Sequence, residues 1–374
     1  MSAVKGAVVD GDLAAEIGRW AATGAVVYGI ASGAHVFAVG ALPIPEGPSS
    51  TAAWVNAFID QVRPILPGGI EPVGVLSNAT RDGADVDLTF STDERGALRC
   101  LRRSASSTVA VPVKTQPGLA SSLHCLTGVI DIGSHDLPFP STREVAAQRL
   151  SESISAYMAK ALFLIDGKQV AADDSSSVSS LGNKDGEHSV EFLVSTLMST
   201  PVSPPRVRFS GSQHVLAYVL PTATITEAVR AVVDDVTRSS LHRLRVFSED
   251  SPTEWSWAPD DASEGRKPAV FHLPRRLPFP VGHVRLSDYA FPGESVDEVN
   301  ERVDEFTGRS NAFESFGAVV EEFPTIDELR PPVPQAIVRS TPAAKPSFLD
   351  LRLLFVLVVP IVIALLVAGT WRLH

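Results

Sequence analysis

The apolar residues in the first 140 positions of this chain follow two spacings, one typical of β-strands and the other typical of α-helices. Residues 25–31 and 35–42 are apolar runs joined by three small residues, a pattern that predicts a β-hairpin. A helix that Ser49, Ser50 or Thr51 can cap is predicted to run to about Leu66, because apolar side chains recur every three to four positions and share one face. Further strands are predicted at 70–76, 86–90, 98–101, 108–113 and 125–132. We therefore expect an α/β (α+β) domain over residues 1–140.

Residues 141–320 show the same alternation and predict a second α/β region. Helices are expected over 143–160 and 227–250, with strands at 161–165, 189–197, 206–210 and 214–220. The longer helix carries charged residues that we expect on its solvated side, namely Asp234, Asp235, Arg238 and Arg243. Two polar segments, 171–186 and 251–267, have the composition of mobile loops.

The end of the chain has a different pattern. The stretch from Leu353 to Trp371 contains no charged residue and, at about 19 residues, has nearly the length that a helix needs to cross a bilayer. Pro360 lies inside it, and membrane helices tolerate proline. Residues 351–374 are therefore predicted to form a single-pass transmembrane anchor, and the proline-rich residues 321–350 are predicted to form an extended stalk before it.

The beginning of the chain has no signal-peptide pattern, because acidic residues occupy the place of an apolar core. With an anchor at the C-terminus, this predicts a tail-anchored protein whose bulk lies in the cytosol. The formal net charge of −11 argues against a surface for nucleic acid or anionic lipid. The chain has two cysteines, Cys100 and Cys125, which cannot form a disulfide framework or a four-cysteine zinc site. We expect both to be small buried hydrophobic residues.

Four segments in order along the chain resemble the odorant-response-abnormal protein four (ODR-four) family. They are QVRPILPGGIEPVGVL at 61–76, AVVDDVTRSSLHRLRVFSED at 231–250, LPRRLPFP at 273–280 and LSDYAFPGE at 286–294. The C-terminal anchor agrees with that family as well. The resemblance implies an MPN-like fold for residues 1–140, that is, a mixed sheet with helices, as in metallo-isopeptidases.

The sequence lacks the zinc motif of an active MPN enzyme. Such an enzyme needs an H-x-H pair just after the strand that contains Val73 and Gly74, together with acidic partners. Residues 75–80 read VLSNAT instead, and H-x-H occurs nowhere in the chain. His135 and Asp136 are the nearest approach to a metal pair, and two adjacent residues are more typical of a solvated turn. We therefore expect no catalytic residue, no cofactor and no metal site.

The favoured hypothesis is a non-enzymatic adaptor on the cytosolic face of the endoplasmic reticulum membrane. The resemblance implies two roles: aiding the folding, localisation and trafficking of polytopic receptors, and tethering the protease specific for the ubiquitin-fold modifier (ufmylation). The alternative is a divergent membrane-bound hydrolase or isopeptidase, for which no G-x-S-x-G motif is present. A third reading is a structural membrane protein with a passive domain.

Four aromatic residues are candidates for binding a protein partner. Trp54 and Phe58 lie on the predicted helix 51–66, where an exposed apolar face would suit docking. Trp255 and Trp257 lie in the acidic segment 251–267, which is either a docking segment or a loop whose tryptophans pack onto the domain. The charged residues of the two later motifs are expected to form one ion-pair network made of Arg275, Arg276, Asp288 and Glu294.

Overall fold

The computed structural model divides the chain into two compact units, Met1–Leu329 and Arg330–His374, and the described residues all belong to the first. They are 4–17, 20, 24–45, 51–76, 86–93, 97–104, 107–138, 143–171, 173–183, 186–193, 206–250, 270–308, 312–313 and 321–329. The predicted anchor with Leu353, Pro360 and Trp371, and the segment with Trp255 and Trp257, lie outside these residues. None of the helices in the described part is both long enough and apolar enough to span a bilayer.

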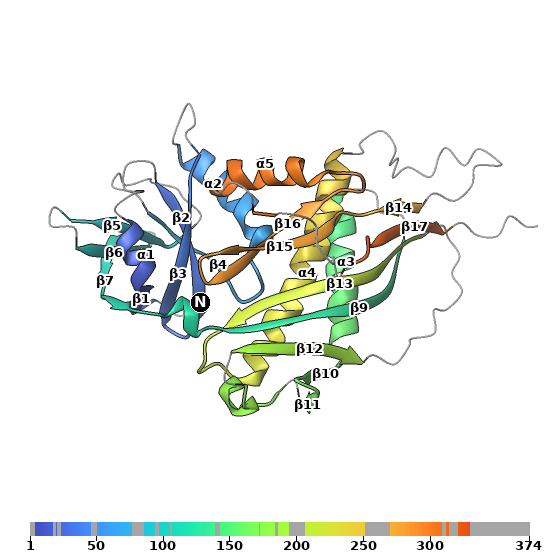
Figure 1. The fold of residues 1–374 in the computed structure, drawn as a ribbon, viewed down its shortest axis with the longest axis horizontal. Coiled ribbons are helices and arrows are strands. Elements are labelled where there is room, and N and C mark those ends of the chain that lie inside the picture. Colours follow the sequence, from blue (N-terminus) through green and yellow to red (C-terminus); the bar gives the residue numbers. More distant parts are fainter. Residues whose placement is uncertain are drawn as a thin grey trace, which may run out of the picture. The chain divides into compact units, whose positions relative to one another are not determined.

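The first sheet is mixed and has eight strands in the order β7-β6-β5-β4-β2-β3-β1-β8 (Figure 1). The predicted hairpin is confirmed, since β2 pairs antiparallel with β3 and Gly33 adopts a positive φ of 59° in the turn. The bounds are β1 Gly6–Asp10, β2 Ala25–Ser32, β3 His35–Pro43, β4 Glu71–Leu76, β5 Leu88–Thr92, β6 Leu98–Ser104, β7 Ser107–Val111 and β8 Val113–Gln116.

Two helices accompany this sheet. The short α1, Gly11–Glu16, begins at Asp10, whose carboxylate accepts the backbone N–H groups of Asp12 and Leu13. The predicted second helix is α2, Ala52–Val62, continued by the 3-10 turn η2, Arg63–Ile65. Thr51 caps α2 through its side chain, as a threonine at this position commonly does.

The second sheet is also mixed and has seven strands in the order β11-β10-β12-β9-β13-β17-β14. Strand β9, which the sequence pattern placed with the first α/β region, lies in this second sheet and pairs with β13 along its whole length. The bounds are β9 His124–Pro138, β10 Leu162–Ile165, β11 Lys168–Val170, β12 Glu187–Leu193, β13 Arg206–Val219, β14 Val270–His272 and β17 Thr325–Leu329. Helices α3, Arg143–Met158, and α4, Ile225–Asp250, cover one face of this sheet (Figure 1).

A third element is the hairpin of β15, Arg275–Val281, and β16, Val284–Ala290, which is followed by helix α5, Val296–Thr307. Ser295 and Glu298 form the capping box that their spacing predicts. The hairpin contributes Leu277, Phe279 and Leu286 to a core that also contains Phe58 of α2 and Leu216 of β13. This shared core binds the first α/β region to the strands of the second.

The serine-rich segment 171–186 has defined contacts where it is described. Residues Val178–Leu181 form the 3-10 helix η4, and Val178 is fully buried. The hydroxyl groups of Ser177 and Ser179 donate to the carbonyl of Pro221 at 3.0 and 2.6 Å. These contacts attach the segment to the loop that precedes α4, although its composition suggests a mobile loop.

Candidate functional site

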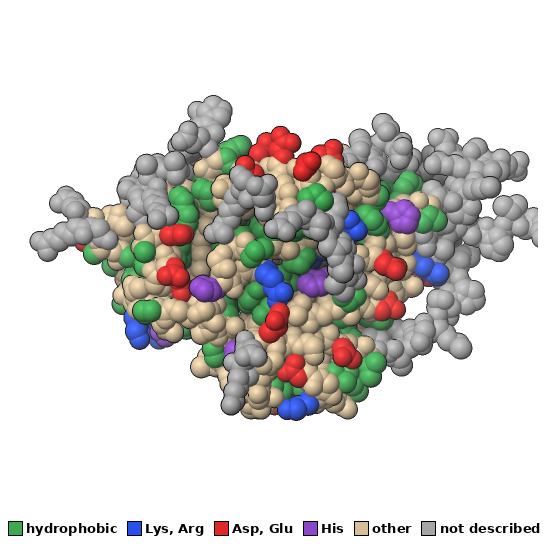
Figure 2. All heavy atoms as spheres, in the orientation of Figure 1, with side chains coloured by type: hydrophobic (Ala, Val, Ile, Leu, Met, Phe, Trp, Pro, Cys, Tyr) green, Lys and Arg blue, Asp and Glu red, His purple; other side chains and the backbone are tan. Residues whose placement is uncertain are grey.

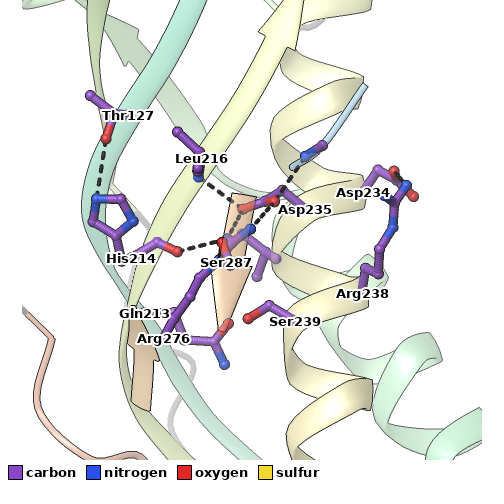
Figure 3. A network of polar contacts seen from close by, with 12 residues as sticks. Thr127, Gln213, His214, Leu216, Asp234, Asp235, Arg238, Ser239, Arg276 and Ser287 are labelled. Carbon is purple, nitrogen blue, oxygen red and sulfur yellow. Dashed lines mark hydrogen bonds and ion pairs between the residues drawn. The ribbon is translucent and has the colours of Figure 1, made fainter. Parts of the chain in front are cut away.

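A fully buried ion pair between Asp235 of α4 and Arg276 of β15 lies where the hairpin meets the second sheet (Figure 3). The guanidinium donates from Nη1 to Oδ2 at 2.6 Å and from Nη2 to Oδ1 at 2.9 Å, with both side chains 1% exposed. This two-point geometry is the one that best offsets the cost of removing both charges from water. Burial alone would lower the pKa of Arg276, but the charge of Asp235 and its hydrogen bonds raise that pKa above the ordinary value.

The same carboxylate also binds two backbone groups. Asp235 accepts the N–H of Gly68 at Oδ1 and the N–H of Leu216 at Oδ2, both at 2.9 Å. The peptide of Gly68 in turn bonds to β13, because its carbonyl accepts the N–H of Tyr218 at 2.8 Å. One buried side chain therefore connects α4, β13, β15 and the loop of residues 66–69, which we call the LPGG loop.

Glycine is required at position 68 by the closeness of α4. A Cβ atom there would lie 2.1 Å from the carbonyl oxygen of Ala231 and 2.7 Å from Cβ of Asp235. Both neighbours are fixed by helix geometry, so neither can move away cheaply. The glycine of the LPGG motif is thus needed for backbone packing in the interior.

A second buried ion pair joins Arg243 of α4 to Glu321. The two side chains are 0% and 1% exposed, and Nη2 lies 2.6 Å from Oε1. The approach does not have the angles of a hydrogen bond, so the attraction is Coulombic. Glu321 also accepts the backbone N–H of His214 at 3.1 Å and that of Arg276 at 2.6 Å, which connects this pair to the first.

Tyr289 of β16 completes this interior. Its hydroxyl donates to Ser239 of α4 at 3.0 Å, and the Arg243 guanidinium carbon lies 5.5 Å from its ring centre. Asp235, Ser239 and Arg243 are four residues apart and therefore share one face of α4. The prediction that Asp235 and Arg243 lie on the solvated side of this helix is wrong, because both are buried.

The expected single network of Arg275, Arg276, Asp288 and Glu294 is also wrong. Arg275 and Arg276 are adjacent in a strand and point to opposite faces, so Arg275 lies 5.0 Å from the ring centre of Phe323 while Arg276 meets Asp235. Asp288 and Glu294 instead bind Arg302 of α5 at 2.8 and 2.7 Å. Burial raises the pKa of Asp288, and Arg302 partly opposes that rise.

Segments from all four motifs therefore meet in one region. The LPGG loop supplies Gly68, α4 supplies Asp235, Ser239 and Arg243, and the hairpin supplies the remaining members, which are Arg276, Ser287 and Tyr289. Hydrogen bonds join Gly68, Asp235, Arg276 and Ser287, and another joins Tyr289 to Ser239. The Arg243 guanidinium instead forms an ion pair with Glu321 and has no hydrogen bond within the described residues. This arrangement fixes the relative positions of helix, sheet and hairpin, and it presents no reactive group to solvent.

The two thiols are poor candidates for a nucleophile. Burial raises the pKa of Cys100 to about 12. Cys125 accepts a hydrogen bond from Arg285 at 3.0 Å, yet burial raises the pKa of its thiol more than the arginine lowers it. His124 neighbours Cys125 along β9 and so points to the opposite face of the strand.

His124 belongs to a chain of three side chains. Its Nδ1 lies 2.7 Å from Nε2 of His188, and Nδ1 of His188 lies 2.7 Å from the carboxylate of Asp166. Since a carboxylate only accepts, His188 donates to Asp166 and accepts from His124. These three hydrogen-bonded side chains connect β9, β12 and the turn after β10, and neither imidazole faces a thiol.

His135 and Asp136 lie in strand β9, where the sequence suggested a solvated turn. His135 is 3% exposed and its Nε2 donates to the carbonyl of Ile132 at 2.8 Å, so its Nδ1 accepts from Ser153 of α3 at 2.9 Å. Asp136 points the other way and binds Arg208 at 2.7 Å. Within the described residues, no group of three histidine, cysteine or carboxylate side chains could hold a metal.

Of the four candidate partner-binding residues, only Trp54 is placed at the surface. It is 38% exposed, and its indole donates to the carbonyl of Pro45 at 3.4 Å. Phe58 is 3% exposed and its ring stacks on Phe306 of α5 at 5.1 Å, so it is a core residue and not an exposed docking residue. Trp255 and Trp257 lie outside the described residues.

The sequence reasoning missed Glu321, which it placed in the stalk, and Gln213, whose amide donates to Ser240 of α4 at 2.8 Å. No local pattern marks either residue. For Asp235 and Ser239 the sequence did contain a pattern that predicts burial. Each lies three residues after a buried valine, Val232 or Val236, and therefore on the helix face that packs on the sheet.

The family model described as "Odorant response abnormal 4-like" matches residues 98–310 of this chain. No curated protein is similar enough in sequence to count as a match. Among solved structures, the crystal structure of UfSP from C. elegans is similar with a TM-score of 0.47 and 11% identity, over 81% of this chain and 56% of that chain. The chain thus spans little more than half of that protein, and at this similarity none of its properties is transferred.

Proposed function

The chain belongs to the odorant response abnormal 4-like family, and from this premise we propose that it is a non-enzymatic adaptor that supports the folding, localisation and trafficking of polytopic receptors. In this proposal the stretch from Leu353 to Trp371 attaches the chain to the endoplasmic reticulum membrane. The folded part then acts in the cytosol on proteins of that membrane. The finer part of the proposal is that the same adaptor tethers the protease of the ubiquitin-fold modifier.

The observation that carries the proposal is the burial of the motif residues. Asp235, Arg243 and Arg276 are at most 1% exposed, and each meets an oppositely charged side chain from a distant part of the sequence. Catalytic groups must reach a substrate, whereas these groups reach only one another. The motifs are therefore best explained as the requirements of a scaffold whose outer surface does the binding.

The thiols and histidines give further support to a non-catalytic role. Neither thiol has the lowered pKa of a reactive cysteine. The imidazole of His135 is held between a carbonyl and a serine hydroxyl, and it meets the ring of Tyr157 edge to face. These contacts join α3 to β9, and burial keeps the imidazole away from a substrate.

The proposed protease tether would use the surface around Trp54. A half-exposed indole on a helix surface is the kind of side chain that dominates protein interfaces. Phe58, one turn further along, fixes the helix by stacking on α5. Trp54 is therefore held on a rigid support, which lowers the entropy lost on docking.

The experiment is a localisation assay with a fluorescent polytopic receptor in cells that lack this chain. Restoring the wild-type chain is expected to move the receptor from the endoplasmic reticulum to its destination. A chain with Cys125→Ala and His124→Ala should restore transport equally, while a chain without residues 353–371 should not. Failure of the cysteine and histidine variant alone, despite a normal fold, would favour the hydrolase alternative.

A further inference from the structure

One face of the second sheet has no described helix packed on it at β10, β12 and the middle of β9. Near Leu216 of β13 the same face is covered by the core shared with α2 and the hairpin. Helices α3 and α4 pack on the side that holds Leu126, Ile130 and Val190 (Figure 1). Alternate residues of the same strands point to the other side. On β10, β12 and β9 these outward residues include Leu162, Leu193, Val129, Glu191 and Asp131, and we call this area the open sheet face.

The open sheet face exposes three large apolar side chains. Leu193 is 60% exposed, and Leu162 and Val129 are each 37% exposed. They are three of the six large hydrophobic side chains that are exposed in the described part of the chain. Leu162 and Leu193 are register partners on adjacent strands, so they form one continuous apolar patch.

Negative charge lies beside this patch. Glu191 lies two residues before Leu193 on β12 and pairs in register with Leu164, and Asp131 is exposed on β9. Neither carboxylate has a cation within ion-pair distance among the described residues, whereas the nearby Arg208 and Arg285 are already bound to Asp136 and Glu187. Figure 2 shows acidic and hydrophobic side chains next to each other over this part of the molecule.

Within the described part of the chain, the histidine that borders the patch adds no positive charge near neutral pH. His214 is the register partner of Val129, and its Nε2 lies 3.2 Å from the Thr127 hydroxyl. Burial and the neighbouring Arg276 lower its pKa to about 4. The open sheet face is therefore apolar and negatively charged at pH 7.

We propose that the open sheet face docks a basic amphipathic helical segment of the membrane proteins that this adaptor serves. The inference rests on the proposed function, since it names the partner chemistry of that adaptor. Cytosolic segments that flank transmembrane helices are rich in lysine and arginine. Such a segment would place its apolar stripe on Leu162, Leu193 and Val129, and its cations on Glu191 and Asp131.

The dimensions agree with one helix. Three neighbouring strands span about 10 Å from the first to the third, and a helix with its side chains is about 10–12 Å across. The charge of the face also distinguishes between two ligands that could cover an apolar surface, an anionic lipid bilayer and a basic peptide. Anionic lipid would be repelled by Glu191, Asp131 and the chain's net charge of −11, whereas a basic peptide would be attracted.

The test measures binding of a fluorescent amphipathic helix of leucine and lysine to the purified full-length chain. One control peptide has glutamate in place of lysine, and another has the same composition in scrambled order. Leu162→Ser with Leu193→Ser is expected to weaken binding at least about tenfold, and Glu191→Lys at least about threefold. Hydrogen exchange should slow in β10 and β12 on binding.

Matched control variants lie elsewhere on the same molecule. Val270→Ser removes a side chain that is 58% exposed on β14, at the far edge of the same sheet. Glu305→Lys makes the same charge change as Glu191→Lys on an exposed position of α5. Both controls are expected to bind the lysine peptide within about twofold of the wild-type chain. All the altered side chains are exposed, so the variants should fold normally.

Three results would overturn the inference: unchanged affinity in the double leucine variant, equal binding of the glutamate peptide, or Leu193-dependent binding of phosphatidylserine vesicles in place of the peptide. The outcome is separable from that of the proposed function. If receptor transport is restored by the double leucine variant, the adaptor role holds and this surface is wrong. If the peptide binds as expected but receptor transport never depends on the chain, the surface holds and the adaptor role is wrong.

Discussion

Asp235 and Arg276 form a two-point ion pair in which each side chain is 1% exposed, although they are 41 residues apart in sequence. Removing one partner would leave the other as an unpaired buried charge. Arg276→Met is therefore expected to lower the free energy of unfolding by about 3–5 kcal/mol. Urea denaturation followed by circular dichroism measures this loss.

The matched control is Arg245→Met on the same helix, α4. Arg245 pairs with Glu249 at 3.0 Å, and both side chains are about half exposed. Solvent screens this pair, so the expected loss is below about 1 kcal/mol. Similar losses for Arg245→Met and Arg276→Met would contradict the structural role assigned to the buried pair.

Gly68→Ala tests the close packing of the LPGG loop. The added Cβ would overlap the carbonyl oxygen of Ala231, and we expect a loss of stability of about 2 kcal/mol or more, as for overpacked interiors. Gly282→Ala is the control, because Gly282 has open space around its Cβ and loses stability only through its positive φ of 63°. A thermal melt that ranks Gly282→Ala as more damaging would disprove the steric requirement at position 68.

The sequence predicted local structure well, because hydrophobic period and capping residues act over a few positions. The β2–β3 hairpin, the start of α2 at Thr51 and the capping box at Ser295 follow from neighbouring residues alone. The buried network did not follow in the same way. Asp235 and Glu321 become interior residues only through partners that are far away in sequence, Arg276 and Arg243.

The pairing of strands was equally beyond local reasoning. Strand β9 follows the first α/β region directly, yet it pairs with β12 and β13 from the second. Phe58 belongs to the apolar face of its helix, but the same apolar spacing is expected for a face that docks a partner and for one that packs in the core. Its burial depends on residues far away in sequence, among them Phe306 of α5.

Acid is expected to destabilise the fold through His214. Its folded pKa is lowered to about 4 by burial and the charge of Arg276, while Asp235 acts in the opposite direction and Arg285 and Arg243 reinforce the lowering. The unfolded chain therefore binds a proton at higher pH than the folded chain does, and stability falls as pH drops from about 6.5 to 4. At pH 5 this histidine should account for a loss of about 2 kcal/mol relative to pH 7.5.

The measurement is urea denaturation of the wild-type chain and of His214→Gln at both pH values. Glutamine cannot gain a proton, so the variant should lose less stability between pH 7.5 and 5 than the wild-type chain. The variant also changes the hydrogen bond to Thr127 and so its stability at every pH. The comparison therefore uses, for each protein, the difference between its free energies of unfolding at pH 7.5 and pH 5. Parallel pH profiles would contradict the lowered pKa.

The thiols are expected to resist alkylation in the folded protein. Burial raises the pKa of both Cys100 and Cys125, so little thiolate is present at pH 7.5, and both side chains are shielded. Labelling with iodoacetamide should proceed at least about 100-fold more slowly than in urea, where both thiols regain an ordinary pKa. Rapid labelling of one thiol in the native chain would revive the hydrolase alternative.

Trp54 and Phe58 separate a binding role from a core role on one helix. Phe58→Ala should lower the free energy of unfolding by about 3–5 kcal/mol, because it removes a buried ring stacked on Phe306. Trp54→Ala removes a side chain that is 38% exposed and should cost less than about 1 kcal/mol. If the surface around Trp54 holds the proposed protease partner, Trp54→Ala should weaken capture of that protease at least about tenfold while stability is retained. Undiminished capture by the folded Trp54→Ala chain would remove this surface from the tether, and the partner site would have to be sought elsewhere on the molecule.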